Sequence, residues 1–209
     1  MRKLLLFIIL LGATSLVRAG AYDDIIAAAN NGESSTVVDL LKRGMDVNTA
    51  DRNGSTLLMI AARTGNRELL ETLLNSRANV NRRNQYGDTA LMLAALSGRL
   101  DMVRVLVERK AALDPSGWTP LHYAVFGGNK EVLALLIAKG AKLDARAPNG
   151  QTPLMIAVKQ QRLELVEQLI DADADMDLTD YEGLTALRLA HQLGNSEIVE
   201  YLRKVGAIE

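Results

Sequence analysis

The chain has 209 residues, of which 23% are charged and 4% are aromatic, and its formal net charge at pH 7 is −1. It contains no cysteine, which excludes disulfides, cysteine-ligated metals and lipid attachment through a thiol. The near balance of charge does not predict a nucleic-acid-binding surface, because that surface would need a basic stripe.

Residues 1–19 have the pattern of a secretory signal peptide. Arg2 and Lys3 give a positive start, and residues 4–11 form an uninterrupted apolar run that is too short to span a membrane. Small residues follow, so we expect cleavage after Ala19, with Ala21 as the alternative. The other interpretation is an uncleaved membrane anchor.

A short leader of this kind is typical of bacteria. We therefore expect the mature chain in the periplasm or outside the cell, without stable insertion in a membrane. Beyond the leader the chain has 21 basic and 25 acidic residues, a net charge of −4. This balance again gives no reason to expect a nucleic-acid partner.

The rest of the chain repeats itself. The pattern Gly-x-Thr-x-Leu occurs five times, and its glycines are evenly spaced except for one step, from Gly87 to Gly117, that is three positions shorter than the others. A period of this length predicts stacked supersecondary units that share a core and offer an extended binding surface. The five glycines are Gly54, Gly87, Gly117, Gly150 and Gly183.

Each copy predicts a short helix, a turn and a second helix. A threonine precedes the apolar run of the first helix as a cap, and Pro120 and Pro153 follow at the first turn. The second helix carries paired apolar residues at helical spacing, which indicates one buried face. The capping threonines are Thr56, Thr89, Thr119, Thr152 and Thr185.

The second helix of each copy should end in a left-handed residue, for which glycine is the least costly choice. Other residues at this position should cost about 1 kcal/mol each relative to glycine. Glycine occupies it at Gly44, Gly140 and Gly206, whereas the remaining copies have Arg77, Lys110 and Asp173.

The fourth copy contains Thr119-Pro120-Leu121-His122-Tyr123-Ala124, which resembles the Thr-Pro-Leu-His-x-Ala hallmark of the ankyrin repeat. A degenerate first copy starts near Tyr22. The resemblance implies an all-α ankyrin-repeat α-solenoid over residues 20–209, built from about six helix-turn-helix repeats with short β-hairpin fingers. The expected repeats are 21–50, 51–83, 84–113, 114–146, 147–179 and 180–209.

In the ankyrin family, partner contacts come mostly from the fingers and from the exposed face of the first helices. The resemblance therefore implies contact residues around each Gly-x-Thr turn and just after each Ala-Ala-like pair. These candidates are Arg52, Asn53, Ser55, Arg63, Gln85, Tyr86, Asp88, Leu96, Trp118, Phe126, Asn149, Gln151, Lys159, Gln160, Tyr181, Glu182, Leu184 and Gln192.

The aromatic candidates are the most informative. Trp118 and Phe126 lie in the same central copy, and Tyr86 and Tyr181 lie on fingers. Hot spots of binding favour such residues inside a polar ring. The alternative is that Trp118 and Phe126 pack against each other or against a neighbouring finger and serve the core. The ring would comprise Arg52, Arg63, Asp88, Lys159 and Glu182.

The shorter step between Gly87 and Gly117 places a shortened finger at residues 114–116. A short finger should leave a notch beside Trp118, and this notch would receive a protruding element of the partner. A tolerated loop deletion is the alternative, because loop length varies freely.

The sequence does not favour a metal or catalytic site. Asp171, Asp173, Asp175 and Glu182 resemble a calcium loop, but Met176 stands where that loop needs glycine. In the ankyrin family the histidine at the position of His122 orders neighbouring turns. No phosphate loop or Gly-x-Ser-x-Gly motif is present. We expect neither enzyme activity nor a cofactor.

The expected function is non-catalytic protein binding in the periplasm, by a monomer that sequesters, inhibits or stabilises another exported protein through its concave groove. One alternative is a secreted effector that binds a host protein. Another is a structural or calcium-dependent scaffold. The step from family to role rests on analogy.

Overall fold

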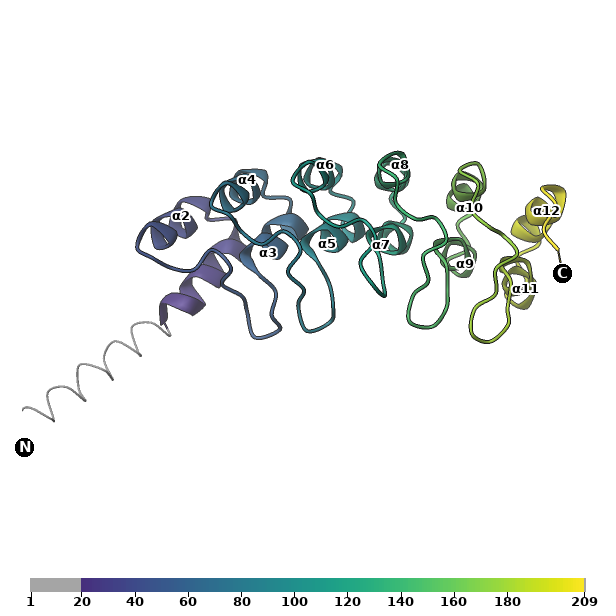
Figure 1. Ribbon diagram of the computed structural model, residues 1–209, viewed down its shortest axis with the longest axis horizontal. Coiled ribbons are helices and arrows are strands. Elements are labelled where there is room, and N and C mark those ends of the chain that lie inside the picture. The colour runs from purple at the N-terminus through teal and green to yellow at the C-terminus, as the bar shows by residue number, and fades with distance from the viewer. Residues whose placement is uncertain (1–19, 209) are drawn as a thin grey trace, which may run out of the picture.

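The structure is a computed structural model that describes residues 20–208. The expected signal peptide lies outside these residues. Two rows of short helices stack side by side into an elongated array, and loops project from one edge (Figure 1). None of the helices in the described part has the length and apolar character needed to cross a membrane.

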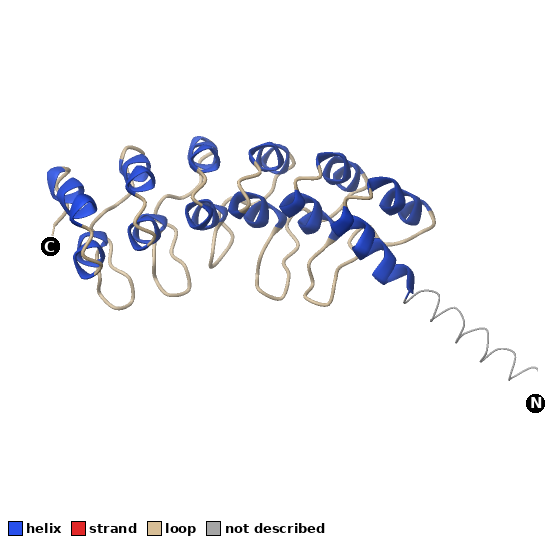
Figure 2. Cartoon of the chain, turned by 180° about the vertical axis from the view of Figure 1, so that it is seen from behind, coloured by secondary structure: helices blue, strands red, loops and turns tan. Residues whose placement is uncertain are grey.

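Each repeat contributes one helix to an inner row and one to an outer row, which also appear in the view from behind (Figure 2). Residues 20–31 form the first helix of the inner row. The inner row continues with α3 (Leu57–Thr64), α5 (Ala90–Leu96), α7 (Pro120–Gly127), α9 (Pro153–Lys159) and α11 (Ala186–Gln192). The outer row contains α2 (Ser34–Lys42), α4 (Arg67–Asn75), α6 (Leu100–Glu108), α8 (Lys130–Ala138), α10 (Leu163–Ile170) and α12 (Ser196–Lys204).

This architecture confirms the predicted all-α solenoid. Neighbouring inner helices pack against each other along the array, and so do neighbouring outer helices. One continuous buried apolar cluster extends from Ile25 in the first repeat to Leu202 in the last. Each repeat thus covers an apolar face that its neighbour cannot bury alone.

Small residues let the inner helices approach one another closely. Ala61 and Ala62 of α3 have no exposed surface, and neither do Ala94 and Ala95 of α5. A larger side chain at these positions would overpack the contact between the helices. The Ala-Ala pairs therefore set the close spacing of the inner row.

The inner helices begin at threonines, as the sequence predicts. At all five positions the threonine hydroxyl accepts the backbone N–H three residues later, at 3.2 to 3.5 Å. Pro120 and Pro153 are the first residues of their helices, where the missing N–H costs nothing. The repeated cap thus gives every inner helix the same start.

Methionine sulfur completes three of these caps, which the sequence analysis did not foresee. The backbone N–H groups of Thr56, Thr89 and Thr152 donate to methionine Sδ at 3.3 to 3.5 Å. In the fourth copy His122 Nδ1 accepts the Thr119 N–H at 3.2 Å. A weakly accepting thioether thus replaces imidazole. The methionines are Met59, Met92 and Met155.

The predicted left-handed residues are confirmed. Arg77 and Lys110 have a φ of 66°, and Asp173 has a φ of 69°. Gln161 also adopts a positive φ of 54°, just after its inner helix, at the position where the other copies have the left-handed Gly65, Gly98, Gly128 and Gly194. The three glycines at the predicted position are left-handed as well, with φ values of 92°, 85° and 101° for Gly44, Gly140 and Gly206.

A ladder of hydrogen bonds links successive repeats just after the outer helices. At each step an Asn or Asp side-chain oxygen accepts a backbone N–H from the segment that follows the next outer helix, at 2.8 to 3.0 Å. These bonds limit rotation of one repeat against the next. They join Asn48 to Asn79, Asn81 to Ala112, Asp114 to Lys142, Asp144 to Asp175, and Asp177 to Ile208.

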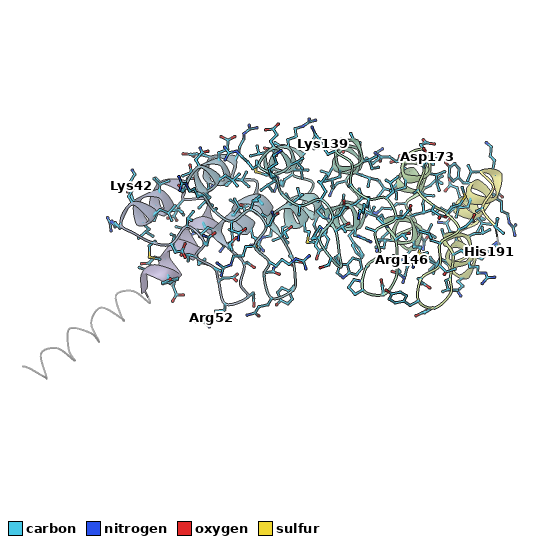
Figure 3. The ribbon with its side chains drawn as sticks, viewed as in Figure 1. Lys42, Arg52, Lys139, Arg146, Asp173 and His191 are labelled. Atoms are coloured by element: carbon cyan, nitrogen blue, oxygen red, sulfur yellow. The ribbon has the colours of Figure 1, made fainter. Side chains whose placement is uncertain are left out.

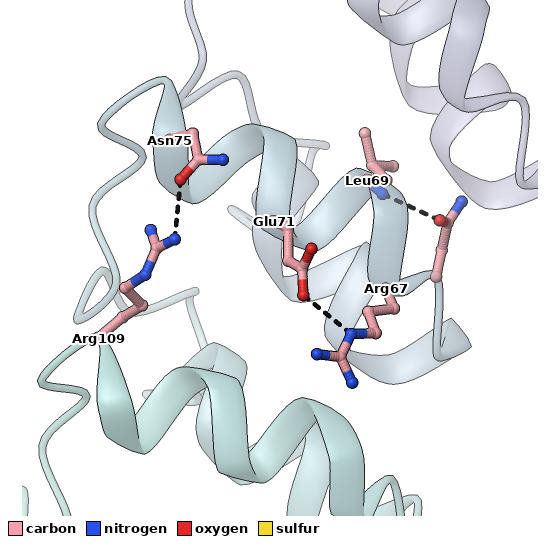
Figure 4. A network of polar contacts seen from close by, with 6 residues as sticks. Arg67, Leu69, Glu71, Asn75 and Arg109 are labelled. Atoms are coloured by element: carbon pink, nitrogen blue, oxygen red, sulfur yellow. Dashed lines mark hydrogen bonds and ion pairs between the residues drawn. The ribbon is translucent and has the colours of Figure 1, made fainter.

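The outer row is held by local polar contacts (Figure 4). Arg67 Nε bonds Glu71 Oε1 at 2.8 Å across one turn of α4, and Asn66 caps the start of that helix. Arg109, at the end of α6, donates to Asn75 Oδ1 of α4 at 2.8 Å. These polar side chains of the outer row are therefore bound to other groups of the fold.

The fingers are loops rather than the expected β-hairpins. Within residues 20–208 the backbone forms no strand, and one isolated antiparallel bridge joins Ala50 to Thr56. In the finger before α3, Asp51 Oδ1 accepts the N–H groups of Asn53 and Ser55, both at 2.8 Å. Two backbone bonds also cross this finger, from the Asp51 N–H to the Ser55 carbonyl at 2.9 Å and from the Leu57 N–H to the Thr49 carbonyl at 3.1 Å.

Candidate functional site

Five equivalent side chains lie at the carboxyl ends of the inner helices. These helices start at equivalent threonines and have 7 or 8 residues, so their ends lie next to one another. All five side chains are exposed, as is the adjacent Gln160. We call this set the inner-helix row, and its members are Arg63, Leu96, Phe126, Lys159 and Gln192.

The centre of the inner-helix row is apolar. Leu96 is 41% exposed and Phe126 is 37% exposed. Phe126 packs on the half-buried Trp118, with ring centroids 5.3 Å apart and planes inclined by 55°. The two aromatic rings thus pack against each other, which was the alternative to a binding role. Phe126 nevertheless remains exposed and available to a partner. That a partner contacts it stays a prediction.

His122 contacts one member of this aromatic pair, Trp118. Its ring meets Trp118 edge-on at 5.4 Å between centroids, and its side chain has no exposed surface. Because Nδ1 accepts the Thr119 N–H, the ring proton lies on Nε2, which donates to the Gln151 carbonyl at 3.2 Å. Burial lowers the pKa of His122 to about 4, so the ring is neutral at pH 7. The expected ordering of neighbouring turns is therefore visible here.

The exposed finger positions hold seven of the candidate residues. Tyr86 and Tyr181 are the most exposed aromatics, at 71% and 72%. The backbone N–H and the Nε2 of Gln85 donate to the carbonyl oxygens of Asn53 and Arg52, both at 2.9 Å. The second finger is thereby fastened to the first. The seven are Arg52, Asn53, Gln85, Tyr86, Asn149, Tyr181 and Glu182.

A solvent-open cavity of about 200 Å³ lies between the fingers that precede α3 and α5. Its lining is apolar at Met59, Ile60 and Leu93 and polar elsewhere. The structure thus brings together candidates that the sequence assigned to separate repeats. Those at the cavity are Asn53, Ser55, Arg63, Tyr86 and Asp88, beside Asp51 and Asn84.

The prediction of Gln151 as a contact residue is wrong. Gln151 is 7% exposed, because it lies at the base of its finger, beside the next inner helix. The same position, directly before the capping threonine, is also partly buried in the other copies, which makes their side chains less available than expected. These half-buried candidates are Ser55, Asp88, Trp118 and Leu184.

Asp88 forms an internal contact that the sequence analysis missed. The Tyr123 hydroxyl donates to its carboxylate, and Asn84 Nδ2 donates to the same group at 3.1 Å. Burial and the neighbouring Asp88 raise the pKa of Tyr123. The available signal was a tyrosine at a position that is aliphatic in the other copies, namely Ile60, Leu93, Ile156 and Leu189.

The finger before α7 is visibly shorter than its neighbours (Figure 1). Arg83, from the finger before α5, donates to the Ser116 carbonyl at 2.8 Å and fastens this short loop. Asp114 within it accepts the Lys142 N–H as part of the ladder. That the notch receives an element of a partner stays a prediction.

The acidic segment after α10 serves its own backbone. Asp175 Oδ1 accepts the Asp177 N–H at 3.0 Å, and Asp180 Oδ1 accepts the N–H groups of Glu182 and Leu184. Over residues 20–208, no group of three or more His, Cys, Asp or Glu side chains is placed to hold a metal ion.

Comparison with known families agrees with this architecture. The family model described as ankyrin repeats (3 copies) matches residues 25–116, 77–147 and 142–208. A comparison with curated proteins gives no match. Ankyrin repeats generally mediate interactions between proteins. The matches span most of the chain and coincide with the stacked helix pairs, so the chain belongs to the ankyrin-repeat family.

Proposed function

We propose that the chain is a non-catalytic protein-binding module of the bacterial periplasm. It sequesters, inhibits or stabilises another exported protein, which it contacts through the inner-helix row and the fingers. The exported location is supported by the signal-peptide pattern of residues 1–19. The binding role is supported by membership of the ankyrin-repeat family.

The observation that carries the proposal is the exposed apolar pair at the centre of the inner-helix row. Leu96 and Phe126 are exposed by 41% and 37%, although the surface around them is polar. Apolar side chains within a polar rim are the usual centre of an interface. The packing of Phe126 on Trp118 holds this surface in place before a partner arrives.

We assign no reaction to the molecule. His122 would be the obvious catalytic base, but it is buried, neutral at pH 7 and engaged on both ring nitrogens. The cavity beside Asp88 is open to solvent, whereas a catalytic site excludes water to strengthen its electrostatics. Binding is therefore the function that these residues support.

Capture of a partner tests the proposal. The tagged protein is incubated with an extract of exported proteins, beside a Leu96→Ala/Phe126→Ala double variant and an Ile208→Ala control. Ile208 is an apolar residue, 69% exposed, near the end of the chain. We expect one protein to be retained by the wild type and the control and lost by the double variant. Equal retention by all three would refute the proposed site.

Fractionation tests the location. Release of the processed protein by osmotic shock, with an amino terminus near Gly20, would support the periplasm. Recovery from the culture medium would instead favour the secreted effector. Intact leader sequence on a membrane-bound protein would contradict both.

A further inference from the structure

We infer that the partner presents to the inner-helix row an extended segment that is apolar at its centre and acidic on both sides. The inference rests on the proposed function, because it names the chemistry of the segment that binds the same surface. It follows from the order of the first four side chains along the row, which is Arg63, Leu96, Phe126, Lys159.

The two cations of the row are not neutralised within the described residues. Arg63 donates to the neutral amide oxygen of Asn30 at 3.1 Å, and no ion pair in the described part of the chain involves Arg63 or Lys159. Both side chains are exposed. Each therefore offers its charge and most of its donors to a carboxylate from outside the chain.

Two cations of the outer row, by contrast, have carboxylate partners. Arg67 pairs with Glu71 at 2.8 Å, and Lys130 pairs with Glu164 at 2.6 Å. Those two charges have partners on the surface of the fold itself. Arg63 and Lys159 are not paired in this way within residues 20–208, and they flank the exposed apolar pair of the row.

The two carboxylates that share a cavity with Arg63 are already engaged. Asp51 and Asp88 share a cavity with Arg63, but Asp51 accepts two backbone N–H groups of its own finger. Asp88 accepts bonds from Tyr123 and Asn84. A basic segment would meet Arg63 at one end and Lys159 at the other, so charge complementarity favours an acidic one.

The spacing of the row fixes the length of the segment. Packed helices lie about 8–10 Å apart, so the three steps from α3 to α9 cover about 25–30 Å. An extended chain advances about 3.3 Å per residue. The two acidic positions should therefore be separated by about 8 residues, with the apolar residues between them.

The acidic residues 171–182 of a second copy are another conceivable occupant. In the folded chain, Asp175 and Asp180 accept backbone hydrogen bonds of their own loops, and Asp173 is held in a left-handed turn. A second copy would have to release these contacts to present an extended segment. This argues for a different protein as the source.

Selection from a displayed library of random dodecapeptides tests the inference with the purified protein as target. We expect enriched sequences with Asp or Glu on both sides of an apolar centre. The best peptide is then synthesised with a fluorophore, and its Kd is measured by anisotropy against the wild type, Arg63→Glu and Lys159→Glu. Lys139→Glu is the matched control, since Lys139 lies on the outer-helix edge, away from Arg52 on the finger edge (Figure 3).

Each charge reversal in the row should weaken binding about 3- to 10-fold at low salt, and Lys139→Glu should change it less than about twofold. The difference should shrink at high salt, because screening shortens the range of exposed charges. Circular dichroism checks that the variants fold.

A basic or uncharged consensus, no enrichment, or row variants that bind as well as the wild type would overturn the inference. So would a consensus like residues 171–182 together with self-association in sedimentation, which would identify a second copy as the occupant. If an exported protein is captured through Leu96 and Phe126 but Lys159→Glu leaves capture unchanged, the proposed function stands and this inference fails. If acidic peptides bind as expected but no exported partner is captured, the inference about the segment stands and the proposed function fails.

Discussion

The buried His122 should make the stability of the array depend on pH in a way that one substitution removes. The chain itself suggests the substitution, because methionine occupies the equivalent position at Met59, Met92 and Met155. In His122→Met the thioether can still accept the Thr119 N–H. The bond from Nε2 to the Gln151 carbonyl is lost, which should cost about 1 kcal/mol at pH 7.

The pH dependence follows from the pKa of His122, which is about 4 in the folded chain and 6.5 when unperturbed. Between these values the unfolded chain binds more protons, so the free energy of unfolding falls as pH decreases from 6.5 towards 4. Between pH 7 and pH 4.5 the loss from this one group is about 2.5 kcal/mol. The variant His122→Met has no imidazole at this position, so it does not show this loss of stability.

Urea unfolding of both proteins at pH 7 and pH 4.5 measures this difference. All ionisable groups other than His122 are the same in both proteins, so their contributions cancel when the two pH dependences are subtracted. Circular dichroism follows the helices, and the fluorescence of Trp118, which touches His122, follows the central repeat. Equal losses of stability in the two proteins would refute a buried, neutral His122, and His122→Met should become the more stable protein at pH 4.5.

Three further substitutions test the backbone and the internal contacts. Gly87→Ala should cost about 1 kcal/mol for its positive φ alone, whereas Gly150→Ala should cost about 1–3 kcal/mol more, since its Cβ would lie 2.8 Å from a backbone nitrogen of the next finger; similar urea midpoints would contradict this. Lys110→Gly should raise the free energy of unfolding by about 0.5–1 kcal/mol by relieving a left-handed residue, and a lower melting temperature would oppose it. Tyr123→Phe should cost about 1 kcal/mol in chemical denaturation through loss of the bond to Asp88, and a neutral result would remove that bond as a stabilising contact.

The fold could be predicted from the sequence because the same local sequence signals recur from copy to copy. A threonine cap, an apolar run and a left-handed end each carry a weak signal in one copy. Their recurrence at a fixed period makes the joint signal strong, and the structure confirms the caps at Thr56 and its equivalents and the positive φ of Arg77, Lys110 and Asp173.

The contacts between repeats were harder to predict, because they depend on how one copy is rotated against the next. Gln151 is a polar residue of a type usually found at the surface, yet the stacking of neighbouring repeats buries it. The bond between Tyr123 and Asp88 joins residues that are 35 positions apart, and no local pattern connects them. The methionine caps escaped notice because methionine in an apolar run is usually only a core residue.

In such an array the residues that differ between copies are the ones that distinguish this chain from any other stack of the same repeat. The fourth copy departs from its neighbours both inside and outside. Inside, His122 and Tyr123 replace methionine and aliphatic residues and add polar bonds to the adjoining fingers. Outside, Phe126 packs on Trp118, and Trp118 in turn contacts the buried His122 ring edge-on. A side chain that is already held in place loses little conformational entropy on binding, so the inner departures prepare Phe126 for contact. His122, Trp118 and Phe126 are thus in contact one after another, and a partner should depend more on the central repeat than on either end.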